Sequence, residues 1–163
     1  MDRRRAAAVV VGLALLAGPA FVLLAAGDRS PVRPAAVDEP AVRVLHAWDE
    51  RRAAAYARGA PERLRDLYVA GSAAGAADVR LLRAYRARGL RVTGMRTHVL
   101  AADVLDRRPD RLRIRVTDRL AGAVAVGGGR RVALPRDAAS TRVLTLMRGG
   151  GGRWRVSAVV DRS

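Results

Sequence analysis

The 163-residue chain contains no cysteine and no lysine, and only 4% of its residues are aromatic. The absence of cysteine excludes disulfide bonds, thiol catalysis and thiolate metal sites, and it is compatible with a location outside the cytoplasm. Apolar residues still make up 50% of the chain, so we expect a core of small and branched aliphatic side chains. We find no internal repeat, and the length allows one domain beyond the N-terminal segment.

The chain is strongly basic, with a net charge of +16, and arginine supplies all 31 of its basic residues. Proteins selected to bind nucleic acid usually combine lysine with arginine, because both neutralise phosphate. Exclusive use of arginine, beside abundant alanine, glycine and valine, is typical of the codon bias of a GC-rich genome. We therefore predict no nucleic-acid partner. The charge does predict a salt-dependent attraction to anionic lipid head groups or anionic envelope polymers.

The run Ala6–Ala26 contains 21 uncharged, mainly apolar residues. As a helix it would span about 30 Å, the thickness of the hydrocarbon layer of a bilayer, so we predict a transmembrane anchor. Arginines flank the run in equal number: Arg3, Arg4 and Arg5 before it, and Arg29, Arg33 and Arg43 after it. The first three are adjacent to the run, and a long C-terminal domain crosses a membrane largely regardless of its charge. We therefore expect residues 1–5 in the cytoplasm and the domain outside the cell membrane.

A cleaved signal peptide is the alternative interpretation, because Ala25-Ala26-Gly27 has the small residues of a cleavage site. Cleavage near Gly27 would produce a secreted protein. The apolar core of a signal peptide spans about 7–15 residues, and this run is longer, which favours the uncleaved anchor. Residues 27–40 are rich in proline and carry charges of both signs, so we interpret them as a solvated linker to a domain at 41–163.

Two helices are expected at the start of this domain. From Ala41 onward the apolar residues recur at helical spacing, with Trp48 and Tyr56 on one face and Arg52 among the charged residues assigned to the others. Gly59-Ala60-Pro61 ends this helix, and Pro61 suits the first turn of a short second helix.

A third helix and four strands follow. Gly71–Gly75 predicts a break, and apolar spacing then indicates a helix over about Ala76–Arg88. Beyond it the apolar period changes from helical spacing to two, which is typical of strands. The predicted strands are Val92–Leu105, Arg111–Val126, Val132–Arg148 with a bend near Pro135, and Arg153–Val160. The prediction is an α+β fold in which three helices pack on a curved four-stranded antiparallel sheet, preceded by the transmembrane helix.

The sequence resembles the nuclear transport factor 2-like superfamily, whose cone-shaped fold is shared with ketosteroid isomerase and small polyketide cyclases. The resemblance covers about Pro40–Asp161 and depends on element order and loose motifs. These are the helix with Trp48 and Tyr56, the Leu64-Leu67-Tyr68 segment, the helix ending at Gly89, and the final strand Gly152-Arg153-Trp154-Arg155-Val156. The chain is also similar to single-anchor extracytoplasmic members of the superfamily from high-GC bacteria.

This resemblance implies a curved sheet that wraps around the first helix and leaves a pocket at its wide end. In the enzymes of the superfamily, acidic and histidine residues inside the cone perform acid–base chemistry. No strict motif marks those residues here, so the resemblance assigns no catalytic residue. The chain also has no zinc signature, no nucleophile elbow and no phosphate-binding loop, and we predict no metal and no cofactor.

Asp118 is the most informative single residue, because it lies on the apolar face of a predicted strand beside Val116 and Leu120. A carboxylate there is costly unless it is paired. One hypothesis is a buried acid with a raised pKa that serves as a general base. The other, which we favour, is an ion pair with an arginine that reaches inward, or a strand end where the face meets solvent.

Three further residues are candidates for a ligand pocket. His98 shares a strand face with Ala102 in the predicted pattern and is a possible base or ligand, although a partly exposed sheet histidine is the simpler interpretation. Trp48 and Tyr56 would line a pocket from the first helix, or would simply be core aromatics whose polar atoms find partners.

Four arginines alternate along the predicted second strand: Arg111, Arg113, Arg115 and Arg119. They form either a site for an anionic surface or the solvated outer face of a half-buried sheet. No aromatic residue is interleaved with them to stack bases, which argues against binding of single-stranded nucleic acid.

Two functions follow, in order of preference. The first is a membrane-anchored extracytoplasmic accessory domain that binds a partner protein or an anionic envelope component, without catalysis. The second is a small-ligand binder, or an isomerase- or cyclase-like enzyme, that uses Asp118 inside a cone. The sequence does not fix the oligomeric state.

Overall fold

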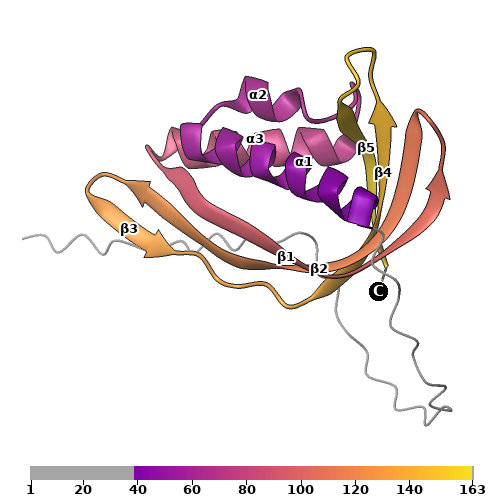
Figure 1. The fold of residues 1–163 in the computed structure, drawn as a ribbon. Helices are drawn as coiled ribbons and strands as arrows, with labels where there is room; N and C mark the ends of the chain where they lie inside the picture. The colour runs from indigo at the N-terminus through magenta and orange to yellow at the C-terminus, as the bar shows by residue number, and fades with distance from the viewer. Residues whose placement is uncertain (1–38, 163) are drawn as a thin grey trace, which may run out of the picture.

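A computed structural model of the protein describes residues 39–162. The elements in chain order are α1 (Glu39–Arg58), α2 (Pro61–Arg65), α3 (Ala73–Ala87), β1 (Arg91–Arg107), β2 (Arg111–Gly127), β3 (Arg130–Ala133), β4 (Ser140–Arg148) and β5 (Trp154–Arg162). The strands form one antiparallel sheet in the order β1-β2-β4-β5, and β3 also pairs with β2. The fold is α+β, as predicted (Figure 1).

The sheet has five strands rather than the four expected. β4 pairs with the first half of β2, from Arg111 to Asp118, and β3 pairs with its last residues, from Val124 to Gly127. The sequence pattern suggested one long strand over 132–148, but residues 134–139 form no strand and divide it. Pro135 lies in this segment and cannot donate a ladder hydrogen bond, which explains the interruption.

The helices begin earlier than the sequence pattern indicated. α1 starts at Glu39, because Pro40 occupies the first turn, where its missing N–H has no partner to lose. α3 starts before the predicted Ala76, because the Ser72 hydroxyl caps it and accepts a hydrogen bond from the Gly75 N–H at 3.2 Å. Gly75 is therefore helical, and a Cβ atom at this position would lie 2.6 Å from Cγ of Tyr68.

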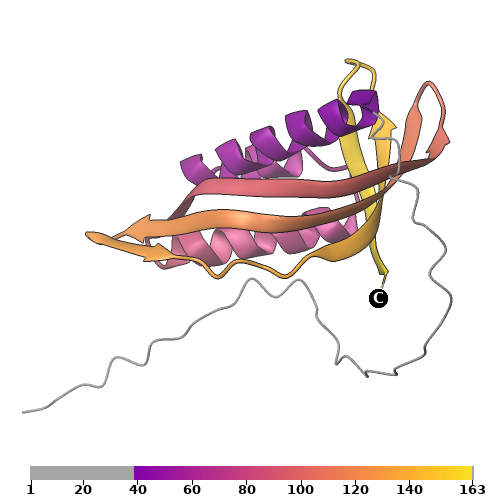
Figure 2. The same ribbon diagram turned by 60° about the horizontal axis from the view of Figure 1, so that its bottom comes forward.

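The helices lie on the concave side of the curved sheet (Figure 1), and a view from the convex side places the strands in front of α3 (Figure 2). The core fills the space between these layers and is mainly aliphatic. Its largest fully buried side chains are Tyr56, Leu64, Leu82, Ile114, Val116, Leu146 and Val156. The Val69 N–H and the Leu67 carbonyl bond to Val156, each at 2.9 Å, so the segment after α2 covers part of the β5 edge.

Within residues 39–162, no helix has the length and apolar character needed to cross a membrane. The predicted anchor at Ala6–Ala26 and most of the predicted linker lie outside the described residues.

Candidate functional site

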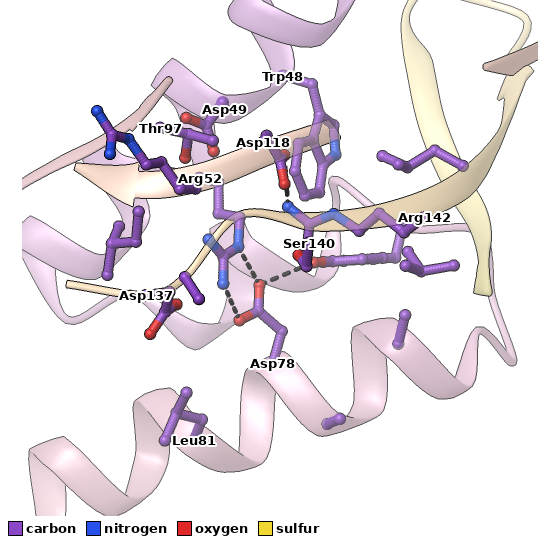
Figure 3. A pocket seen from close by; sticks show the side chains of 18 residues that line it. Trp48, Asp49, Arg52, Asp78, Leu81, Thr97, Asp118, Asp137, Ser140 and Arg142 are labelled. Carbon is purple, nitrogen blue, oxygen red and sulfur yellow. Dashed lines mark hydrogen bonds and ion pairs between the residues drawn. The ribbon is translucent and has the colours of Figure 1, made fainter. Parts of the chain in front are cut away.

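A cavity of about 360 Å³ lies between the helices and the concave face of the sheet (Figure 3). Six of its larger apolar lining residues come from α1, the segment after α2, α3, β2, β4 and β5: Trp48, Tyr68, Leu81, Leu120, Leu144 and Val159. A volume of this size accepts a small organic molecule, and a mainly apolar surface is typical of ligand pockets. Nine of the 18 lining residues are nevertheless polar, and seven of these are charged.

The Asp118–Arg142 ion pair forms part of the cavity wall. Asp118 lies on the inward face of β2 and is only 6% exposed, beside Val116, whose partner across the ladder is Arg142 of β4. One terminal nitrogen of Arg142 donates to Oδ2 of Asp118 at 2.6 Å. The Arg142 Nε is buried and has no hydrogen-bond partner among the described residues. Arg142 is therefore an arginine that reaches inward and pairs with Asp118, as the favoured interpretation of the sequence expected.

Opposing influences act on the protonation of Asp118. Burial raises the pKa of its carboxyl, the nearby Asp49 carboxylate raises it further, and the charge and hydrogen bond of Arg142 oppose both; the net direction is upward. Asp118 therefore accepts a proton more readily than an ordinary aspartate, and so does Asp137 in the same wall, whose pKa is also raised by burial.

A second ion pair, Arg52–Asp78, adjoins the same cavity and connects α1 to α3. Nε and one terminal nitrogen of Arg52 donate to the two carboxylate oxygens of Asp78, each at 2.7 Å. The hydroxyls of Tyr56 and Tyr68 donate to the same carboxylate at 2.6 and 2.7 Å. Burial alone would raise the pKa of Asp78, but the Arg52 charge and these hydrogen bonds outweigh it and lower the pKa. The environment therefore favours the ionised form of Asp78, whereas it favours the protonated form of Asp118.

The sequence interpretation missed this network because Arg52 was assigned to a solvated face of its helix. Its spacing is in fact that of the buried stripe, four residues after Trp48 and four before Tyr56. Asp78 likewise precedes Val79 within the apolar stripe of α3. The sequence did contain a signal for this pair. Arg52 and Asp78 place opposite charges on the apolar stripes of two helices, and buried charges are tolerated when they pair with one another.

Trp48 and Asp118 line the cavity, whereas Tyr56 does not. Tyr56 lies behind the cavity wall, fully buried, with its hydroxyl on Asp78. Trp48 is fixed in place because its indole N–H donates to the Leu67 carbonyl at 3.1 Å and its ring meets Tyr68 edge to face at 5.6 Å.

His98 lies outside the cavity, and its side chain is exposed. The predicted strand face grouped it with Ala102, which is buried. The ladder between β1 and β2 shifts register between Val99 and Ala101, and such an irregularity changes which residues face inward. His98 and Ala102 therefore face opposite sides of the sheet, a change that alternation alone cannot predict.

Two arginines of the β2 ladder, Arg113 and Arg115, lie exposed on the convex face of the sheet, and Arg115 is 3.9 Å from Asp103. Arg119 is also exposed, but it lines the cavity. Arg111 is half-buried and donates to Asp106 at 2.6 Å. Among residues 39–162, no three His, Asp or Glu side chains are grouped closely enough to hold a metal ion.

Neither a protein-family model nor a curated protein sequence matches the chain. Several solved structures do match. The intermembrane space region of the chloroplast protein ARC6 superposes with a TM-score of 0.55 and 12% identity, over 80% of this chain and 99% of that one. Aln2 from a Streptomyces species has a TM-score of 0.50 and 15% identity, over 78% of this chain and 93% of that one. A putative dehydratase from the NTF2-like family of Streptomyces avermitilis has a TM-score of 0.44 and 14% identity, over 74% of this chain and 94% of that one.

At these identities the comparisons concern the fold alone. The described domain shares its fold with the ARC6 region and with Aln2, which is consistent with the resemblance noted in the sequence.

Proposed function

We propose that the domain is a binding domain that holds a small, mainly apolar molecule in the cavity beneath α1 and α3. The observation that carries this proposal is the cavity itself, about 360 Å³ in volume, with a mainly apolar surface that includes two buried carboxylates, those of Asp78 and Asp118. Binding without catalysis fits the accessory role expected from the sequence. Whether the domain acts outside the membrane, tethered by Ala6–Ala26, stays a prediction.

The charges that line the cavity indicate the kind of ligand. Arg142 and Arg52 are each engaged by an aspartate. Asp49 and Asp137 also line the cavity, both half-buried, and so does the exposed Arg119; none of the three has an ion-pair partner among the described residues. The two carboxylates outnumber this one guanidinium, which disfavours an anionic ligand and favours a neutral or cationic one.

Three naphthalene derivatives that differ only in their polar group test this proposal: naphthylmethanol, naphthylmethylammonium and naphthoate. Isothermal titration calorimetry on the full-length protein in a neutral detergent gives the dissociation constants. We expect saturable binding of the alcohol and the ammonium compound, and affinity for the carboxylate weaker by about tenfold, about 1.4 kcal/mol. Equal binding of all three, or of none, would refute the proposed ligand class.

A matched pair of variants locates the binding. Ala77 of α3 lines the cavity, whereas its neighbour Ala76 does not, and both positions are exposed. Ala77→Phe should fill the cavity and abolish binding of naphthylmethanol, and Ala76→Phe should leave it unchanged. If the two variants behave alike, the cavity is not the binding site.

Proton transfer by Asp118 is a second candidate function, because burial raises the pKa of this residue in the cavity wall. The Arg142 bond limits this role, since a proton acceptor must be free to leave its partner. Titration of the Asp118 carboxyl by NMR decides the matter. An ordinary or lowered pKa would remove Asp118 from consideration as a base.

A further inference from the structure

One end of the domain gathers arginines that the cavity and the β2 ladder do not involve. The C-terminal ends of α1 and α3, the start of β1 and the β2–β3 hairpin meet there (Figure 1). These segments carry six exposed arginines, which we call the arginine end: Arg58, Arg86, Arg88, Arg91, Arg130 and Arg131.

Backbone geometry brings these residues together. The side-chain stems of Arg86 and Arg91 both approach within 4 Å of the position that a Cβ atom on Gly59 would occupy. Gly59 directly follows Arg58 in the chain. Across the sheet, Arg91 pairs with Val126, and Val126 pairs with Arg131 on its other side. Four arginines from four separate elements thus lie at one end of the domain.

No ion pair with an aspartate or glutamate of residues 39–162 neutralises any of the six. On the β2 ladder, by contrast, Arg111 and Arg115 each have an acidic neighbour. Positive charge at a helix C-terminus is favourable, and this accounts for Arg58 and Arg86. It does not account for Arg91 or for the hairpin arginines, which lie beyond the helices.

We propose that the arginine end is a docking site for an anionic polymer with closely spaced phosphate groups. Unpaired guanidinium groups on one surface bind repeated phosphates by charge and by paired hydrogen bonds. The described chain begins at Glu39, at the opposite end of the 20-residue α1, about 30 Å away along the helix axis. A chain tethered through its N-terminus therefore presents the arginine end away from its attachment. Because of this position, a polymer is a better candidate for the partner than the surface of the lipid bilayer is.

Binding of long-chain inorganic polyphosphate to the full-length protein in a neutral detergent tests the proposal. The test variant is Arg86→Gln, Arg91→Gln and Arg131→Gln together. Each phosphate contact contributes about 0.7–0.9 to the slope of log Kd against log salt concentration. The triple variant should therefore lower that slope by about 2–3 and weaken binding by at least about tenfold at low salt.

The matched control removes the same charge from the β2 ladder, as Arg113→Gln, Arg115→Gln and Arg119→Gln. We expect its affinity to stay within about twofold of the unchanged protein. Equal losses in both triple variants would show that binding follows net charge alone, and would overturn the proposal. No binding of polyphosphate by the unchanged protein would also overturn it. So would tighter binding to anionic phosphatidylglycerol vesicles than to polyphosphate, which would make the partner a membrane surface.

Discussion

Replacing Asp78 with asparagine should strongly lower the free energy of unfolding of the domain. The Asp78 side chain is 7% exposed, and that of its partner Arg52 is 16% exposed. The substitution removes the negative charge that balances the buried guanidinium and weakens two tyrosine hydrogen bonds. Removing one member of a buried ion pair costs about 3–5 kcal/mol. That is a large fraction of the stability of a small domain, about 5–15 kcal/mol.

Urea denaturation followed by far-ultraviolet circular dichroism measures this cost. Asp106→Asn is the control, because Asp106 also pairs with arginine but at the protein surface, where ion pairs contribute little. We expect a large fall in the unfolding midpoint for Asp78→Asn and almost none for Asp106→Asn. Replacing both Arg52 and Asp78 with leucine should destabilise less than Asp78→Asn alone, since no buried charge is left unpaired. Similar midpoints for the two asparagine variants would refute this account of the network.

Two further predictions concern Asp118 and Gly75. The pKa of Asp118 is higher in the folded state than in the unfolded state, where it is about 3.9. The stability that Asp118 contributes is therefore present below about pH 3.9 and is lost as the pH rises through the folded-state pKa. The stability of the unchanged protein relative to Asp118→Asn should therefore fall as pH rises above about 4, and a difference in unfolding free energy that rises instead would contradict the raised pKa. For Asp78 the sign is opposite: its pKa is lowered, so its contribution is present above about pH 4 and is lost on acidification. Gly75→Ala would place a methyl group 2.6 Å from the Tyr68 ring, so it should cost about 1–3 kcal/mol by thermal unfolding. Gly150→Ala meets nothing within 4 Å and should have little effect; equal costs would disprove the close approach.

The sequence predicted those features of the fold that depend on local periodicity. Both long helices and the alternation along β2 follow from spacing and from proline and glycine positions. The pairing of β3 and β4 with the same strand was not predictable in this way. It depends on where the chain bends between Leu134 and Ala139, and a single proline marks that bend only weakly.

The candidate site was predicted only in part, for a similar reason. Asp118 was identifiable because a charge on an apolar strand face is rare. Its partner Arg142 was not, because it belongs to a strand 24 residues later in the chain and thus depends on register. His98 was a pocket candidate in the sequence but lies outside the cavity, because one irregularity in the β1–β2 ladder changes the face on which it lies. Most apolar positions within an element followed from the sequence, whereas the inward position of Arg52, the outward position of His98 and the contacts between elements required the structure.

The most direct test of the binding cavity uses the two tryptophans of the chain as internal reporters. Trp48 lines the cavity and Trp154 does not, and their indole N–H signals can be followed separately by NMR in ¹⁵N-labelled full-length protein in detergent. On titration with naphthylmethanol, the account predicts a saturable shift of the Trp48 signal and an unmoved Trp154 signal. An unmoved Trp48 signal, or equal and unsaturable shifts of both, would contradict it.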